Sequence, residues 1–372
     1  MESMAITRNQ WVEKKDLNYI LKKSSEELQI LAGKKLLLTG AGGFLGYYFI
    51  KSILAWNDNN PKKSIQLTSL STFRDGIPEW LNLLKGRKDL IILKKDITKY
   101  TLPTSLIFDY IIHAASFASP TVFRQYPVET INANVLGLYK ILEYMLQRKK
   151  KKRPFSGLLF FSSSEIYGDP TEGNIPTPET YRGNVSCTGP RACYDESKRF
   201  CETLCINYAK SYGLPIKSAR PFNNYGPGMK ITNGRVVADF SKNILENKDI
   251  IMFSDVSPSR VFSYIADVIV GYFKILTKGK AGEAYNIGIE GPEISILNLA
   301  ERMVEIGKKN FFYTGKIVIK KNKDENYLTD NPDRRQPLLC KARKELGYDP
   351  RISIDEGLRR VLYWYKNTYY KV

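Results

Sequence analysis

A tyrosine and a lysine spaced i, i+4 form the first pair in this chain that could carry out chemistry. Tyr194 and Lys198 lie in the segment Tyr-Asp-Glu-Ser-Lys, and at that spacing their side chains share one face of a helix. An ammonium beside a phenol lowers the pKa of the phenol toward that of a useful general base. Upstream, Ser163 and Glu165 follow a predicted strand, where a hydroxyl can share a substrate proton with the tyrosine. The pattern predicts an acid–base site.

The glycine-rich segment 39–46 (TGAGGFLG) is a second candidate site, and it predicts a bound dinucleotide. A predicted strand precedes it and a predicted helix follows it, as the dinucleotide fingerprint requires. Gly40 permits the tight turn, Gly43 lets the backbone approach a pyrophosphate, and Gly46 allows close packing of the helix. The N-terminus of the helix then supplies amide donors and a favourable dipole for the phosphates.

Residues in or just after the next two predicted strands bear on which dinucleotide is bound. Thr68 and Ser69 stand where most dinucleotide folds place an acidic residue that holds the adenosine ribose, and a hydroxyl can still bond that ribose. Arg74 nearby could instead meet a 2′-phosphate, so this region leaves NAD and NADP both open. Asp96, after the third predicted strand, either faces the adenine or simply terminates the strand.

The elements that must position these residues alternate along the chain from residue 34. Helices are expected at 47–55, 127–148 and 195–212. Short apolar runs between them predict buried parallel strands at 35–39, 64–70, 90–93, 110–113, 157–162 and 216–219. This alternation predicts an α/β fold built on a doubly wound parallel sheet of the Rossmann type.

The chain divides into three expected segments. Residues 1–33 have apolar residues at helical spacing and predict a helical extension that packs on the main domain. Residues 34–219 are expected to form the dinucleotide-binding Rossmann domain. Residues 220–372 are expected to form mainly a smaller, mixed substrate lobe, with some strands and helices returning to the Rossmann domain, and to end in a helix near 355–368.

The composition excludes several classes of protein. With 43% hydrophobic and 26% charged residues among 372, the chain is neither mainly disordered nor collagen-like. The net charge of +19 should attract anions, whether nucleic acid, anionic membrane or a phosphorylated small molecule. Five cysteines and a single histidine argue against a disulfide framework and against a zinc site. No apolar run could span a membrane and no secretory signal is recognisable, so a cytoplasmic protein with reduced thiols is expected.

Six segments together resemble the extended short-chain dehydrogenase/reductase family, in its nucleotide-sugar branch. They are TGAGGFLG, DYIIHAAS, SSSEIYGDP, GPRACYDESKR, RPFNNYGPG and RVFSYIAD, and the resemblance covers about residues 34–364. Within that branch, TGPRACYDESKRFCETL and NGRVVADF are most similar to UDP-glucuronate decarboxylases and, more distantly, to dTDP-glucose 4,6-dehydratases.

The resemblance implies an NAD-dependent enzyme that acts on a nucleotide-diphosphate sugar through a transient 4-keto sugar. Tyr194, helped by Lys198 and Ser163, would remove the proton of the sugar 4-hydroxyl while C4 gives hydride to NAD; decarboxylation or elimination would follow, and the hydride would return. The implied cofactor contacts are Gly40, Gly43, Phe44, Leu45, Gly46, Thr68, Arg74, Asp96, Ile97, Ala114, Ala115, Ser116, Tyr194 and Lys198.

The resemblance also implies roles for residues outside the acid–base pair. Substrate phosphates would be bound by Asn223, Arg235, Arg260 and Arg335, since an arginine fork suits phosphate geometry. His113 would be structural, beside the cofactor. Family members commonly dimerise through two helices that pack as a four-helix bundle, so a homodimer is expected, with the helix of Tyr194 in its interface.

Positions 164, 165 and 228 bear on the reaction type. The dTDP-glucose dehydratases carry Thr-Asp-Glu, in which the Asp protonates the departing hydroxyl. This chain has Ser164 and Glu165, the pattern of decarboxylases and of GDP-mannose dehydratases, whereas typical 4-epimerases lack the Glu. Where decarboxylases carry an arginine near the substrate carboxylate, this chain has Gly228, so a uronic acid would need another cation, such as Arg182, Arg191 or Arg235.

These residues order the expected activities. Decarboxylation of UDP-glucuronate ranks first, 4,6-dehydration of dTDP-glucose or GDP-mannose second, and epimerisation third. A non-catalytic protein that binds RNA or a partner is the rival from another class, and the intact set of Ser163, Tyr194 and Lys198 argues against it. The basic run 148–153 has no interleaved aromatic residues and predicts a solvated loop rather than a nucleic-acid site.

Overall fold

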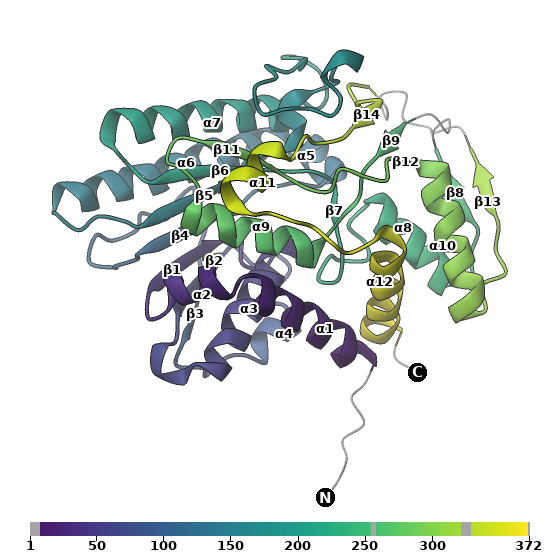
Figure 1. Cartoon of the computed structure of the whole chain (residues 1–372), viewed down its shortest axis with the longest axis horizontal. Helices are drawn as coiled ribbons and strands as arrows, with labels where there is room; N and C mark the ends of the chain where they lie inside the picture. Colours follow the sequence, from purple (N-terminus) through teal and green to yellow (C-terminus); the bar gives the residue numbers. More distant parts are fainter. Residues whose placement is uncertain (1–7, 254–257, 321–328, 371–372) are drawn as a thin grey trace, which may run out of the picture.

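The predicted alternation of strands and helices forms one seven-stranded parallel sheet in the computed structural model, which describes residues 8–253, 258–320 and 329–370 (Figure 1). The strand order is β11-β6-β5-β4-β1-β2-β3. The strands are β1 (Lys35–Thr39), β2 (Gln66–Ser71), β3 (Leu90–Lys94), β4 (Tyr110–His113), β5 (Gly157–Phe161), β6 (Ile216–Pro221) and β11 (Ala284–Ile287). The predicted fold class is confirmed: central strands such as β1, β4 and β5 are buried on both faces, whereas the edge strand β3 leaves Ile91 exposed.

Alternate residues of the central strands feed two separate cores. Leu36 and Leu38 of β1 pack in the larger core, whereas Leu37 packs in the other. The larger core includes residues of α3 (Phe44–Asn59) and α9 (Ile265–Lys278), and the second includes residues of α6 (Pro127–Lys150) and α7 (Ala192–Tyr212). In Figure 1 these two helix pairs lie on opposite faces of the sheet.

The N-terminal segment contributes two helices to the larger core. Its two helices are α1 (Arg8–Lys23) and α2 (Ser25–Leu31), which pack against α3, α9 and α12 (Ile354–Tyr369). Asp16 is fully buried there and accepts hydrogen bonds of 2.6 Å from each of Tyr48, Tyr264 and Arg360. The extension therefore joins distant parts of the chain, since Tyr48, Tyr264 and Arg360 all contact Asp16.

The region after residue 220 contains short strands and helices, and it returns to the main sheet through β11 and α9. The short strand pair β9 (Ser259–Arg260) and β14 (Arg334–Arg335) is parallel and sets Arg335 beside Arg260. The remaining elements are α4 (Glu79–Asn82), α5 (Pro120–Gln125), β7 (Asn224–Tyr225), α8 (Val236–Leu245), β8 (Ile250–Met252), β10 (Ser263–Tyr264), β12 (Ile294–Ser295), α10 (Ile296–Phe311), β13 (Ile317–Ile319), α11 (Cys340–Leu346) and the 3-10 turns η1 (Pro61–Lys63), η2 (Ser164–Tyr167) and η3 (Glu172–Asn174).

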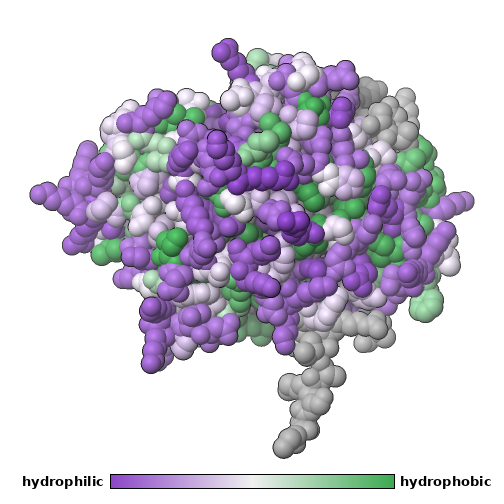
Figure 2. All heavy atoms as spheres, in the orientation of Figure 1, coloured by the Kyte–Doolittle hydropathy of each residue, from purple (hydrophilic) through white to green (hydrophobic). Residues whose placement is uncertain are grey.

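Hydrophilic side chains cover most of the face shown in Figure 2, with hydrophobic ones in scattered groups between them. Among the described residues, no helix combines the length and the apolar character that crossing a bilayer would take. All five cysteines are free thiols.

Candidate active site

The predicted acid–base residues come together where β5 ends and α7 begins. Tyr194 and Lys198 lie one turn apart near the start of α7, and both are buried. The Lys198 Nζ donates a 2.7 Å hydrogen bond to the carbonyl of Phe161 and lies 5.6 Å from the centre of the Tyr194 ring. Ser163, two residues after β5, lies close enough to Tyr194 that its hydroxyl favours the ionised phenol. Ser163 and the Tyr194–Lys198 pair, which are distant in the sequence, thus lie in one cluster.

The electrostatics of this cluster differ from the expected lowering of the phenol pKa. Burial raises the pKa of Tyr194 to about 12, although the hydrogen bond with Ser163 and the charge of Arg235 act in the opposite direction. Burial also lowers the pKa of Lys198 to about 8, since its ammonium is desolvated. The expectation was wrong in direction because desolvation of the phenol outweighs the neighbouring charges.

A stack of three side chains holds the Tyr194 ring in place. The ring of Phe123, on α5, lies 5.0 Å from that of Tyr194 with the two planes 13° apart. The guanidinium of Arg191 lies 5.4 Å from the same Phe123 ring. Sequence reasoning missed Phe123, because nothing in the spacing along the chain brings α5 to α7.

Glu165 is locked between two arginines. Arg335 donates two hydrogen bonds to it, of 2.6 and 2.7 Å, and Arg191 donates a third of 2.5 Å. Burial acts to raise the pKa of Glu165, but the charges of the two guanidinium groups lower it to about 2. The side chain is therefore a fixed carboxylate at neutral pH, next to the turn that carries Ser163.

The four residues expected to bind substrate phosphates are placed differently from one another. Arg335 is occupied by Glu165, and Arg260 donates to the carbonyls of Ser259 (2.7 Å), Asp333 (2.8 Å) and Pro332. Arg235 donates to the carbonyl of Ala118 at 2.9 Å, and Asn223 donates to that of Val261 at 3.1 Å. Arg235 is near Tyr194, because its charge acts on the phenol pKa. Arg335 therefore belongs to the acid–base cluster through its contact with Glu165, and the four residues do not form a separate group.

Asp195 is a further polar group that the sequence analysis did not single out. It is 4% exposed, its Oδ2 lies 3.6 Å from the Arg191 Nε, and its Oδ1 has no described partner. Burial, and after it the charge of Glu165, raises the pKa of Asp195. The side chain lines a polar pocket of 430 Å³ whose other walls come from residues 168–169, 184–186, 330, 331 and 333.

The glycine turn after β1 has the geometry that a dinucleotide requires. Gly40 has φ +74°, and a Cβ there would lie 2.6 Å from the carbonyl carbon of Ala114. A Cβ on Gly46 would lie 2.4 Å from the carbonyl oxygen of Ala41, so only glycine lets α3 approach the turn this closely. Gly43 directly precedes α3, whose first turn contains Phe44 and Leu45. The residues therefore fit a pyrophosphate at the N-terminus of α3.

A hydrogen-bonded chain links the loop after β4 to the catalytic helix. Ala114, Ala115 and Ser116 follow β4 at the same edge of the sheet as the glycine turn. Ser116 donates to Asn134 at 2.7 Å, Asn134 donates to Ser197 at 2.8 Å, and Ser197 donates to the carbonyl of Tyr194 at 2.9 Å. This arrangement couples the position of the predicted cofactor loop to that of the phenol.

The remaining predicted cofactor residues are more scattered. Thr68 lies inside β2, buried and paired with Leu37 and Ile91, three residues before the strand ends at Ser71. Asp96 accepts two hydrogen bonds from Thr98, and Ile97 is buried in the core. Arg74 stacks on Phe117.

His113, at the end of β4, is buried. Its Nδ1 lies 2.8 Å from the hydroxyl of Thr39, and burial lowers its pKa to about 3, which keeps the ring neutral.

Comparisons with known proteins agree with this geometry. The model of the NAD dependent epimerase/dehydratase family matches residues 36–288. The chain is 32% identical over 333 residues to UDP-glucuronic acid decarboxylase 1 of Arabidopsis thaliana, covering 90% of this chain and 70% of that protein. It is 29% identical over 339 residues to UDP-glucuronic acid decarboxylase 1 of Xenopus tropicalis, covering 90% and 72%.

Solved structures of similar fold include a UDP-glucose 4-epimerase from Thermotoga maritima with UDP-glucose (TM-score 0.74, 22% identity, 90% of this chain and 99% of that one). A dTDP-glucose 4,6-dehydratase from Streptomyces venezuelae with NAD bound gives a TM-score of 0.74 at 23% identity, over 90% and 97% of the two chains. These structures share the fold, and the family model and the curated relatives share the sequence. The chain therefore belongs to the NAD-dependent epimerase/dehydratase family.

Proposed function

We propose that this protein converts UDP-glucuronate to UDP-xylose and carbon dioxide with bound NAD. The observation that carries the proposal is the cluster of Ser163, Tyr194 and Lys198 beside Glu165, a carboxylate that two arginines hold ionised. Similarity along most of the chain to UDP-glucuronic acid decarboxylases supports this substrate.

Each member of the cluster has a distinct task in this reaction. NAD, when bound, supplies reversible hydride transfer at C4 of the sugar. Tyr194 accepts the proton of the 4-hydroxyl as C4 is oxidised and returns it when C4 is reduced. Because burial raises the pKa of the phenol, positive charge and hydrogen bonds must favour its ionised form, and Ser163 and Arg235 both act in that direction.

Loss of carbon dioxide needs the ketone at C4. When the bond between C5 and the carboxylate breaks, its electron pair moves into the enolate formed with the C4 carbonyl. Ser163 and the protonated Tyr194 are placed to hydrogen-bond that oxygen as its charge develops. One proton from solvent then adds to C5, so the overall reaction consumes one proton.

The state of Glu165 separates decarboxylation from 4,6-dehydration. A dehydratase must protonate a departing hydroxyl. With a pKa of about 2, Glu165 has no proton to give at neutral pH, and the position before it is the serine Ser164. The 4,6-dehydratase alternative therefore ranks second.

The arginine that decarboxylases carry at position 228 has no room here. Gly228 has φ +87°, and a Cβ on it would lie 2.8 Å from the ring of Tyr47. We propose that Arg191 and Arg235 supply the positive potential for the uronate instead, because both are near the acid–base cluster, whereas Arg182 is exposed. Binding of the nucleotide diphosphate by Asn223, Arg235, Arg260 and Arg335 also remains a proposal.

The test is the mass of the products after purified enzyme is incubated with NAD and, separately, UDP-glucuronate, dTDP-glucose or GDP-mannose. We expect a UDP-pentose from UDP-glucuronate only, and its loss by about 10²-fold or more in rate in Tyr194→Phe, which removes the acid–base hydroxyl. Tyr181→Phe, a tyrosine outside the cluster, is the matched control. Loss of water from either neutral sugar would make the protein a dehydratase. Recovery of all three substrates unchanged would contradict both the decarboxylase and the dehydratase assignment.

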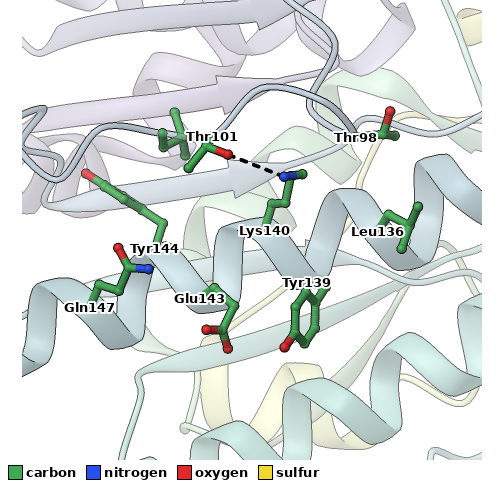
Figure 3. A pocket seen from close by; sticks show the side chains of 9 residues that line it. Thr98, Thr101, Leu136, Tyr139, Lys140, Glu143, Tyr144 and Gln147 are labelled. Atoms are coloured by element: carbon green, nitrogen blue, oxygen red, sulfur yellow. Dashed lines mark hydrogen bonds between the residues drawn. The ribbon is translucent and has the colours of Figure 1, made fainter.

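We also propose a homodimer formed through α6 and α7. These helices pack side by side and expose apolar side chains on the outside, among them Ile131, Leu136 and Tyr139 on α6 and Phe200 on α7. Figure 3 shows Leu136 and Tyr139 on α6, in a pocket of 340 Å³ beside the loop at 98–102. A second copy seated on this face would bury them. The cytoplasmic location is likewise a proposal, supported by the five free thiols.

A further inference from the structure

We infer that Arg74 clamps the pyrophosphate of the bound dinucleotide from the side opposite the glycine turn, with the ring of Phe117 behind it. The guanidinium of Arg74 lies 4.3 Å from the centre of the Phe117 ring. The inference rests on the cofactor site of the proposed function, and it assigns to Arg74 a partner other than the 2′-phosphate considered from the sequence.

The strand order places this contact over the cofactor turn. Arg74 lies in the loop after β2 and Phe117 in the loop after β4, and β1 is the strand between those two. A contact between the two loops must therefore pass over the carboxyl end of β1, where the turn at 40–46 begins. In doubly wound sheets the pyrophosphate lies at this point, against the N-terminus of the following helix.

Neighbouring residues fix the segment that carries Arg74. The ring of Phe73 is buried and lies 3.1 Å from the position of a Cβ on Gly42, inside the same glycine turn. On the other side, Asp75 forms a 2.5 Å ion pair with Lys230 of the loop after β7. Both lobes thus hold the segment 73–75 beside the turn.

Arg74 itself keeps its charge available. It is exposed, and within the described part of the chain it forms no ion pair. Stacking on an aromatic ring uses the face of a guanidinium and leaves its N–H groups, which lie at the edge, free to donate. A planar fork of this kind matches two phosphate oxygens.

The direction of the side chain favours the pyrophosphate over a 2′-phosphate. The adenosine ribose is expected beside the end of β2, at Ser71, and a 2′-phosphate would lie there. Arg74 instead reaches away from β2 and across β1 toward Phe117. A clamp on the pyrophosphate acts equally on NAD and NADP, which share that group.

Titration calorimetry with NAD and with NADP separates these assignments. We expect Arg74→Ala to weaken both dinucleotides by the same factor, about tenfold to a hundredfold, because one charge-assisted contact is lost. Phe117→Ala should weaken both less, and Phe117→Tyr, which keeps the ring, should change neither. Lys62→Ala is the matched control, since it removes an equally exposed positive charge at the opposite end of β2.

Three results would overturn the clamp. Arg74→Ala could weaken NADP alone, which would assign the residue to the 2′-phosphate. It could leave both affinities unchanged, which would make the stack on Phe117 a surface contact only. Lys62→Ala could weaken dinucleotide binding as much as Arg74→Ala does, which would attribute the effect of Arg74 to the net charge of the protein alone. A native protein that binds neither dinucleotide would instead refute the cofactor of the proposed function, so the two failures are distinguishable.

Discussion

At the scale of single residues, Arg191 does more than its place in the sequence suggested. It donates to Glu165, lies beside Asp195 and stacks on the ring that supports Tyr194. Removing one partner of a buried ion pair leaves the other charge uncompensated. Arg191 is therefore a positioning residue for the carboxylate and, through Phe123, for the phenol.

A pH profile tests this role. In Arg191→Met the pKa of Glu165 should rise, because burial then acts against fewer opposing charges. The carboxylate of the native protein stays ionised far into the acid range, whereas the variant should lose turnover as pH falls through a higher value. At pH 7 we expect kcat to drop by about tenfold to a hundredfold through misplacement of the side chain. Arg191→Lys should restore part of the lost kcat. If activity falls at the same acid pH in Arg191→Met as in the native protein, the assignment is contradicted.

At the scale of elements, the close packing of α3 on the glycine turn requires a residue without a side chain at Gly46. In Gly46→Ala the new Cβ would lie 2.4 Å from a backbone oxygen, so α3 must shift. We expect a loss of about 1–3 kcal/mol in unfolding free energy and weaker retention of NAD, measured by urea denaturation and by the cofactor content of the purified protein. Gly173→Ala, where a Cβ meets nothing within 4 Å, should leave both measurements unchanged.

The elements also show what could be predicted from the sequence. β1 and β4 have the predicted bounds, because a short apolar run between polar residues marks a buried strand at both ends. β2 begins two residues later and ends one residue later than the predicted strand 64–70, because its serine and threonine residues carry no such signal. The Tyr194–Lys198 pair follows from helical spacing alone. The contact of Glu165 with Arg335 joins residues from distant elements, and no local pattern predicts it.

At the scale of the whole molecule, the exposed apolar side chains of α6 and α7 predict the assembly state. Light scattering should give twice the chain mass of 42.6 kDa for the native protein. Phe200→Asp, which places a charge on the 50% exposed α7 position, should shift the mass toward that of one chain. Phe312→Asp makes the same change at a 91% exposed residue after α10 and should leave the dimer intact. A single-chain mass for the native protein would refute the interface.

The buried Asp16 has a consequence for how the chain is made. Its partner Arg360 lies 344 residues later, on a helix near the end of the chain. At the usual pace of synthesis, α1 must wait on the order of 20–70 s after it is made before that guanidinium exists. During this interval the carboxylate of Asp16 lacks its positively charged partner, so it remains in water because burying an unpaired charge is costly. Helix α1 is therefore among the last elements to complete its contacts, because it cannot reach its final packing until Arg360 has been made.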